Sequence, residues 1–343
     1  MKKCFALLLA LVTALAAATT AWATVTPAEP VMPSVTVEDQ TYTDITSVPI
    51  AKLYQLVNEG TVSPAETFHF TITPESVTDA SITDASAMPM FEPAAFDIAF
   101  TGGEATVDGA SQSAELMLPT YTSVGIYTYK ITETAGTTAG VTYNTQPLYL
   151  KVTVLQADNS DGKVRVAAVH LGTEDGSKTA GIVNTYAAGA LDVTKTVAGL
   201  LGDRGKDFQF QVVLTREQGK LIASDIGLTV AGAPQAMPAW DEDGTCTLTF
   251  TLKHGQTATI SNLPYGTAYT VTEADYTAEG YATSKTGDTG TIAAAQATAA
   301  FTNTKNGTID TGVLLDSVPY MVLLVIAAAG GVLLALRRRG NRS

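Results

Sequence analysis

Residues 191–197 read LDVTKTV. Successive side chains of a β-strand point to opposite faces, so this stretch builds one apolar face with Lys195 in the middle of it and one polar face. The apolar row is Leu191, Val193, Lys195 and Val197, against Asp192, Thr194 and Thr196. A second stretch, PIAKLYQ at residues 49–55, places Lys52 between Ile50 and Tyr54 in the same way. Both lysines stand where a core side chain is expected.

The chain from about residue 41 to about residue 303 is built of short alternating runs. Examples are FHFTI, YTYKITE, LYLKVTVL, KVRVAAV, FQFQVVL, CTLTFTL and AYTVTE, separated by Gly, Asp and Asn. No long apolar stripe of helical period occurs among them. Many short strands with regular turn signals are typical of all-β sandwiches. We therefore predict an all-β fold of immunoglobulin-like sandwiches.

A weak internal repeat divides this region in two. Each half has a strand with a central lysine, then a Phe-x-Phe strand, then an aromatic strand ending in Thr-Glu, and finally a strand containing Asn-Thr. The Phe-x-Phe pairs are Phe68 and Phe70 in the first half and Phe208 and Phe210 in the second. We predict two homologous sandwiches, at residues 41–188 and 189–305, joined by a hinge at residues 186–190 (YAAGA).

Each predicted sandwich places one lysine, one glutamate and one asparagine on core-facing positions. The two trios are Lys52, Glu133 and Asn184, and Lys195, Glu273 and Asn303. Two plain interpretations exist: a buried Lys–Glu ion pair with the Asn as hydrogen-bond partner, or a misjudged register in which the lysines face solvent. An unpaired buried charge costs several kcal/mol, so the first needs close contacts.

A third interpretation is chemical. Burial lowers the pKa of a lysine, and a neutral amine is a nucleophile. A buried glutamic acid stays protonated more readily and can move protons between the amine and a departing nitrogen. The product would be a Lys–Asn isopeptide amide, with ammonia released. Such a reaction runs once in each domain, so the chain modifies itself and is not an enzyme with turnover.

The ends of the chain predict export. Residues 1–23 combine two lysines, an apolar core and the small-x-small motif AWA, which is the pattern of a secretory signal peptide. Residues 24–40 are rich in proline and predict an extended lead-in. Residues 320–336 are uncharged, long enough for a membrane helix, and followed by three arginines that would stay on the cytoplasmic side.

Composition excludes several classes of function. With 33 acidic against 20 basic residues, the net charge of −13 argues against nucleic-acid binding. Cys246 is the one cysteine outside the signal peptide, so no internal disulfide is expected. His69, His170 and His254 show neither triad nor zinc spacing, and the acidic run at residues 241–243 fits a hairpin turn better than a Ca²⁺ loop. We predict no metal and no cofactor.

Several segments resemble the FctA-type backbone pilins of Gram-positive sortase-assembled pili, the two-domain streptococcal shaft proteins. In the second domain these are LDVTKTVAGLLGDRGKDFQFQVVLT, FTLKHGQTATISNLPYGTAYTVTEADYTAEGYAT and FTNTK; in the first they are GIYTYKITE, GVTYNTQPLYLKVTV and IVNTY. The resemblance spans essentially the whole chain. It implies pilin-type (Cna-B) sandwiches with one isopeptide bond each: Lys52–Asn184 assisted by Glu133, and Lys195–Asn303 assisted by Glu273.

The same resemblance assigns residues 306–343 to a cell-wall sorting signal. Residues 309–312 (IDTG) stand where the family has a Leu/Val-Pro-x-Thr-Gly-like motif, with Asp310 in place of the proline. A sortase would cut between Thr311 and Gly312 and pass Thr311 to a lysine of the next subunit or to the peptidoglycan precursor. The family's acceptor lysine corresponds to Lys178, in GSKTAGIVN.

The function predicted from the sequence is thus a structural subunit of a covalent pilus, extracellular and held transiently at the membrane before sorting. Its partners would be sortase, neighbouring subunits, the wall precursor and host surface molecules, with no nucleic acid. The alternatives are a monomeric anchored adhesin or stalk protein, and a surface enzyme. A surface lysine without a partner and an ordinary membrane anchor remain open interpretations of Lys178 and of the C-terminal tail.

Overall fold

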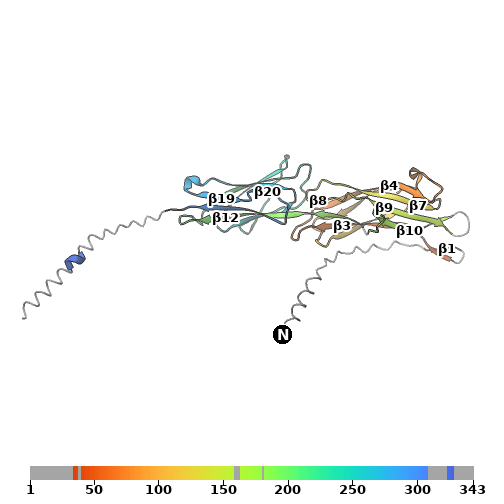
Figure 1. The fold of residues 1–343 in the computed structure, drawn as a ribbon, viewed down its shortest axis with the longest axis horizontal. Helices are drawn as coiled ribbons and strands as arrows, with labels where there is room; N and C mark the ends of the chain where they lie inside the picture. The colour runs from red at the N-terminus through yellow and green to blue at the C-terminus, as the bar shows by residue number, and fades with distance from the viewer. Residues whose placement is uncertain (1–33, 38–39, 158–162, 180, 308–322, 328–343) are drawn as a thin grey trace, which may run out of the picture.

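The computed structural model describes residues 34–37, 40–157, 163–179, 181–307 and 323–327, and the regular secondary structure in these ranges is almost entirely β-strand (Figure 1). The predicted all-β class is confirmed. The predicted signal peptide, the Thr311–Gly312 cleavage site and most of the predicted membrane segment lie outside the described residues. Within the described ranges, no helix is both long and apolar enough to cross a membrane.

The first sandwich has, in its described part, one sheet in the order β10-β9-β7-β4-β5 and a facing sheet in the order β6-β3-β11-β8. A separate hairpin of β1 (Ser34–Val37) and β2 (Gln40–Thr43) precedes it, so part of the predicted extended lead-in is paired. The strands of the first sandwich are β3 (Ser47–Leu56), β4 (Glu66–Thr78), β5 (Ala95–Phe100), β6 (Ala110–Met117), β7 (Gly125–Thr134), β8 (Val141–Thr142), β9 (Leu148–Gln156), β10 (Val164–Gly172) and β11 (Gly181–Tyr186).

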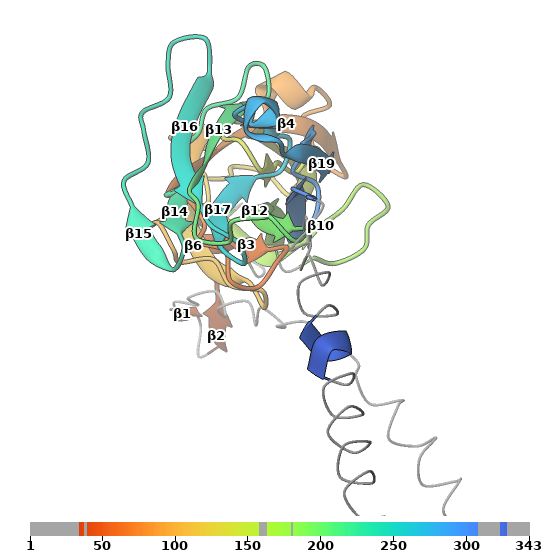
Figure 2. The same cartoon turned by 90° about the vertical axis from the view of Figure 1, so that its left-hand side faces the viewer.

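The second sandwich packs a sheet in the order β15-β14-β17-β12-β21-β19 against one in the order β16-β13-β18-β20. Figure 2 views the molecule end-on, with strands of the two sandwiches overlapping in projection. The buried apolar side chains of the second sandwich form one core cluster. The strands of this sandwich are β12 (Ala188–Ala198), β13 (Phe208–Thr215), β14 (Gly227–Val230), β15 (Ala233–Gln235), β16 (Thr245–Leu252), β17 (Thr257–Pro264), β18 (Ala268–Glu273), β19 (Ala282–Thr286), β20 (Thr289–Thr291) and β21 (Gln296–Thr304).

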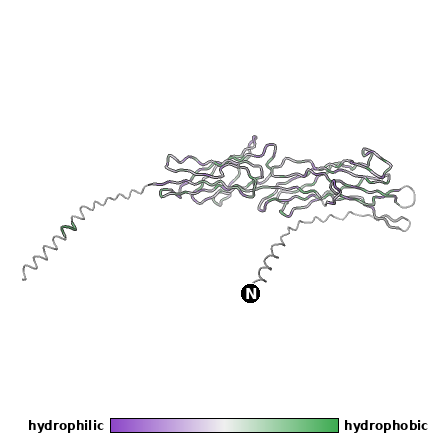
Figure 3. Tube along the Cα trace, in the orientation of Figure 1, coloured by the Kyte–Doolittle hydropathy of each residue, from purple (hydrophilic) through white to green (hydrophobic). Residues whose placement is uncertain are grey.

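Alternation of side chains explains both cores. Along β13, the residues Phe208, Phe210, Val212 and Leu214 are buried while the glutamines between them are exposed. Hydrophilic and hydrophobic residues alternate in this way along much of the trace (Figure 3). Two separate apolar clusters result, one built from residues 48–188 and the other from residues 191–301. Burial of one face of each strand is the main stabilising term.

In both sandwiches the first and last long strands lie side by side and parallel. β3 pairs with β11 in the first sandwich, and β12 pairs with β21 in the second. Parallel strands need a long crossover connection, which here is the remainder of the sandwich. This pairing brings residues far apart in the sequence, from the two ends of each unit, onto one sheet face.

The segment between the sandwiches is a packed joint, so the expectation of a hinge at residues 186–190 is wrong. Ala187 and Ala188 are buried, and Ala187 hydrogen-bonds through its amide to Gly140 O and through its carbonyl to Tyr265 N. The small side chains let three backbone segments approach closely. At Gly140, which has a φ of 79°, a Cβ would lie 2.6 Å from the Ala187 carbonyl oxygen.

Further hydrogen bonds tie the sandwiches together beside this joint. Asn262, in the left-handed region with a φ of 59°, uses its carboxamide to accept from Val62 N and to donate to Val62 O, both at 3.0 Å. Asn58 donates to Ala188 O at 2.7 Å. A bridge joins Thr138 to Leu221, with Ala139 N donating to Leu221 O at 2.9 Å. The two units are therefore clamped from several sides.

Candidate functional site

The first trio assembles from three strands. Lys52 lies on β3 and Asn184 on the parallel β11, where Lys52 is opposite Ile182 and Asn184 is opposite Tyr54. The two residues are thus diagonal neighbours on one sheet face. Glu133 comes from β7 of the facing sheet and is paired with Phe70. The side chains of Lys52 and Glu133 are 0 % exposed, so the interpretation with a solvent-facing lysine is wrong.

Within this trio, the carboxylate of Glu133 bridges the other two side chains. Lys52 Nζ donates to Glu133 Oε2 at 2.7 Å, and Asn184 Nδ2 donates to Glu133 Oε1. The remaining carboxamide oxygen, Asn184 Oδ1, accepts a hydrogen bond from the backbone N–H of Asn144 at 2.9 Å. The polar groups of the trio are therefore held in one connected network.

The second trio repeats the same register on its own strands. Lys195 of β12 is opposite Phe301 of the parallel β21, and Asn303 is opposite Val197. Glu273 of β18 is paired with Phe210, as Glu133 is with Phe70. The Lys–Asn offset and the Glu–Phe pairing are therefore identical in the two sandwiches. Lys195 and Glu273 have side chains 0 % and 2 % exposed.

The contacts of the second trio are less complete. Lys195 Nζ lies 2.6 Å from Glu273 Oε1 without the alignment of a hydrogen bond, and Asn303 Nδ2 donates to the same oxygen at 3.1 Å. Glu273 Oε2 and Asn303 Oδ1 are buried and have no hydrogen-bond partner among the described residues. One carboxylate oxygen thus serves both partners here, whereas in the first trio each partner has its own.

Burial controls the charge state of both lysines. Removal from water lowers the pKa of Lys52 to about 8, and the contact with Glu133 offsets only part of that effect. Desolvation likewise lowers the pKa of Lys195, against the opposing influence of Glu273. A larger fraction of each amine is therefore neutral near physiological pH than in an exposed lysine, which makes each one a better nucleophile.

The Phe-x-Phe strands form the apolar walls of the two sites. Lys52 Nζ lies 4.5 Å from the ring centroid of Phe68 and 5.5 Å from that of Phe70. Lys195 Nζ lies 4.2 Å from Phe208 and 6.0 Å from Phe210. The ring faces stabilise the cation before reaction while their bulk excludes water. The sequence repeat showed these pairs, but their role beside the lysine was not predicted.

One contributor was missed altogether. The N–H group that contacts Asn184 belongs to Asn144, in the turn after β8, and a backbone donor leaves no residue-type signature in a sequence. The only available signal was a polar turn, YNTQP, between two short alternating segments. That signal predicts a turn and gives no information about what the turn contacts.

The other predicted site residues lie apart from the trios. Lys178 is exposed and forms a bridge with Gly172 in the turn between β10 and β11. Thr311 and Gly312 are outside the described residues. His69 lies on exposed β4 surface beside Asp97, and His254 accepts a hydrogen bond from Val197 N. Among the described residues, no three His, Cys, Asp or Glu side chains gather as metal ligands would.

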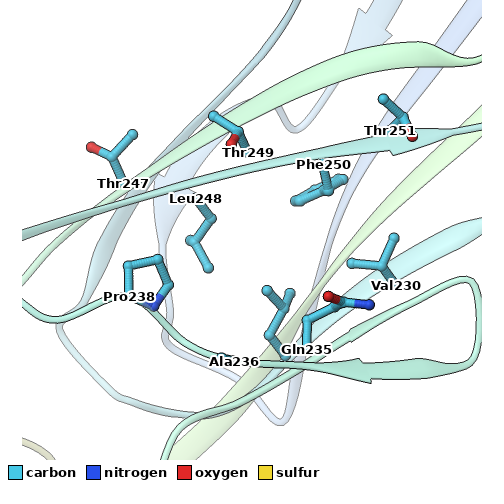
Figure 4. A pocket seen from close by; sticks show the side chains of 10 residues that line it. Val230, Gln235, Ala236, Pro238, Thr247, Leu248, Thr249, Phe250 and Thr251 are labelled. Atoms are coloured by element: carbon cyan, nitrogen blue, oxygen red, sulfur yellow. The ribbon is translucent and has the colours of Figure 1, made fainter.

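A shallow pocket of about 360 Å³ lies at one open edge of the second sandwich, between β16 and the β14–β15 hairpin (Figure 4). Thr247, Leu248 and Phe250 line one side, and Gln235 and Pro238 line the other. No charged side chain lines it. The pocket is therefore separate from the trios and is lined by no ionisable side chain.

The architecture and the paired trios define a class of protein built of tandem β-sandwiches, each with a buried Lys–Glu–Asn cluster between its first and last strands. Residues 48–187 match the family of the Spy0128-like isopeptide containing domain, FctA, and residues 189–305 match a domain of unknown function, DUF7601. A pilin of Streptococcus pyogenes serotype M1 is 28 % identical over 319 residues, covering 87 % of this chain and 92 % of that protein.

Solved structures agree. The crystal structure of the major pilin from Streptococcus pyogenes is 27 % identical, with a TM-score of 0.50, and the match covers 76 % of this chain and 99 % of that one; a point mutant of that pilin matches equally well. The first sandwich matches the FctA domain family, and the resemblance to FctA-type streptococcal pilins predicted from the sequence is confirmed. It is a structural pilus subunit.

Proposed function

We propose that this pilin is the repeating shaft subunit of a cell-surface pilus and that each sandwich forms one intramolecular isopeptide bond. The bonds are Lys52–Asn184, assisted by Glu133, and Lys195–Asn303, assisted by Glu273. The observation that carries the proposal is the identical register of the two trios, together with the burial of all the reacting groups. Residues 41–188 and 189–305 act as the two bonded domains.

The reaction follows from the contacts. The neutral lysine amine attacks Cγ of the asparagine, and the glutamate takes the proton that the nitrogen loses. The same carboxyl group protonates Nδ2, to which it is already hydrogen-bonded, and ammonia departs. One C–N bond forms and one breaks. The protein fold supplies the high effective concentration that this uncatalysed amide exchange lacks in water.

The second of these bonds lies where load would be carried. Each bond joins the first strand of a sandwich to its last, and β11 continues through Ala187 into β12. With Lys178 as acceptor, tension would run from Lys178 through β11 and β12 to Lys195. It would then cross to Asn303 and leave through the C-terminal segment. The strands between residues 196 and 302 would carry none of it.

Sortase joins the subunits in this proposal. It would cleave between Thr311 and Gly312 and transfer Thr311 to Lys178 of the next subunit, or to the peptidoglycan precursor for the last one. The exposed position of Lys178 supports its role as acceptor. Before transfer the chain is held at the membrane; afterwards it is extracellular. Host surface molecules are further partners, and the chain has no enzymatic turnover.

Intact mass spectrometry of the purified protein tests the bonds: the mass should be lower than the sequence sum by two ammonia molecules. A mass equal to the sequence sum would falsify the proposal for both domains. Polymerisation is tested in the native host by blotting cell-wall extracts. An SDS-resistant ladder indicates a shaft, and a single band indicates a monomeric stalk. A Lys178→Ala chain that still forms the ladder would exclude Lys178 as acceptor.

A further inference from the structure

The backbone amide of Asn144 lies 2.9 Å from Asn184 Oδ1, the oxygen on which negative charge develops when the lysine attacks. We propose that this N–H group is the oxyanion donor of the first isopeptide reaction. The inference rests on the proposed self-linking of the first domain and assigns to that reaction a group outside the Lys–Glu–Asn trio. Preorganised amide donors aimed at a developing oxyanion are a major source of catalysis in acyl transfer.

The fold places this donor through a short strand. β8 pairs with the end of β11, with Thr142 opposite Thr185, so the chain leaving β8 passes beside Asn184. The Asn144 side chain then fixes the turn, since its Nδ2 donates to Gln146 O at 2.8 Å and its Oδ1 accepts from Gln146 N at 3.2 Å. The Asn144 N–H group is therefore already in position before Lys52 attacks, and it does not need to move during the reaction.

The same contact fixes which way the carboxamide points. A backbone N–H can only donate, so the atom of Asn184 facing Asn144 must be the oxygen, and the NH₂ group must face Glu133. Attack of Lys52 Nζ on Cγ then moves the carbonyl electrons onto Oδ1, where the Asn144 N–H stabilises the negative charge by donating a hydrogen bond. The proton released by the amine passes through Glu133 to Nδ2, ammonia leaves, and the carbonyl re-forms.

The second domain gives the contrast. Asn303 Oδ1 is buried, and no donor reaches it among the residues that the structure describes. The Lys, Glu and Asn register is nevertheless the same in both domains. Among the residues that the structure describes, the amide donor is therefore present in the first domain and absent from the second, and the second reaction serves as an internal reference within the same molecule.

Replacing the amide by an ester removes the N–H and little else. The α-hydroxy analogue of asparagine would be introduced at position 144 during cell-free translation of the chain. The matched control is an ester at Thr145, which is exposed and whose N–H makes no hydrogen bond. Samples are quenched over time and digested, and the cross-linked Lys52–Asn184 and Lys195–Asn303 peptides are quantified by mass spectrometry.

With the ester at position 144, the first bond should form about 10²–10³-fold more slowly relative to the second. The ester at Thr145 should leave the ratio unchanged. A first bond that forms at the unmodified rate with the ester at position 144, or equal slowing by both esters, overturns the inference. The same esters in a Glu133→Ala background, where no first bond forms, report folding alone through the thermal unfolding midpoint.

Failure of the self-linking reaction and failure of the Asn144 role give different experimental results. If the unmodified chain never loses ammonia from the first domain, the proposed self-linking is wrong and the amide has no reaction to assist. If the unmodified chain reacts and the chain with the ester at position 144 reacts equally fast, the self-linking stands and only the role of Asn144 is lost.

Discussion

A lysine buried among phenylalanine rings is costly until it reacts. Taking its charge out of water costs several kcal/mol, and the nearby carboxylate recovers only part of this. An isopeptide bond replaces the ammonium by a neutral amide and removes the amine from titration. The same burial that makes Lys195 expensive therefore both activates it and favours the product.

The Lys195→Ala variant isolates this effect. Its second domain should retain its ammonia. That domain should lose at least about 4 kcal/mol of stability, because a cross-link closing a loop of about 100 residues is worth roughly 4–5 kcal/mol in the chain-entropy account. Intact mass and urea unfolding measure the two quantities. Lys206→Ala is the control, since Lys206 is a surface residue paired with Glu279. It should change the mass only by the substitution itself and stability by less than about 0.5 kcal/mol.

The lowered pKa of Lys52 gives a pH dependence when its bond cannot form. In an Asn184→Ala variant the amine stays free, with a pKa of about 8 in the folded chain against an ordinary value of 10.5. Between these values the unfolded chain binds more protons, so the free energy of unfolding of the first domain should rise with pH from about pH 8 upwards. Below about pH 8 the amine is protonated in both states, and the full free-energy cost of burying its charge destabilises the folded domain.

Urea unfolding between about pH 7.5 and about pH 9.5 measures this slope below the usual range of tyrosine ionisation. Adding Lys52→Met to the Asn184→Ala background should flatten it. A slope that persists without Lys52 would assign the effect to another group.

At the scale of elements, the proposed bonds depend on the parallel pairs β3–β11 and β12–β21. A strand pair alone would place Lys beside Asn, but the acid must come from the facing sheet. Glu133 and Glu273 each end the apolar run of a central strand, opposite the second phenylalanine of the Phe-x-Phe motif. The site therefore exists only when both sheets have closed, which couples the chemistry to completed folding.

Edge strand β16 provides a probe of this coupling. Cys246 on β16 is buried, and burial raises the pKa of its thiol, so a thiol reagent should label it only when the second sandwich opens. In protein that begins after the predicted signal peptide, labelling should be about 10³-fold faster in Lys195→Ala than in the bonded chain, following the lost cross-link energy. The labelling rate is measured from the absorbance of the chromophore that the reagent releases. Equal rates in the two proteins would mean that β16 opens independently of the bond.

At the scale of the whole molecule, hydrogen bonds on several sides of the joint link the two sandwiches. Asn262 is the clearest part of that clamp, because it holds Val62 by two hydrogen bonds and Asp225 O by a third at 3.0 Å. A shaft subunit benefits from such a joint, since load then reaches the covalent links without first straightening a hinge.

The Asn262→Gly variant should loosen this joint while keeping the left-handed backbone that glycine adopts freely. We expect the two sandwiches to tumble with more independence, measured as separate ¹⁵N relaxation correlation times, with both isopeptide bonds still present by mass. Ala231→Gly is the matched control, because Ala231 is also left-handed but exposed in the β14–β15 hairpin. If the two sandwiches of Asn262→Gly still tumble together, the packing of the alanines and glycine at the joint is enough by itself to hold them.

The sequence by itself determined the strands, their buried faces and the identity of the trios. These follow from a period of two and from a repeat, both of which are local properties of the chain. The tertiary structure alone decided three things: the two-residue offset of Lys and Asn, the packed joint where a hinge was expected, and the Asn144 amide on Asn184 Oδ1. Each depends on how distant backbones approach one another, and a backbone N–H or carbonyl is the same at every residue. A sequence can name the side chains that react, but only the folded chain decides which backbone groups surround them.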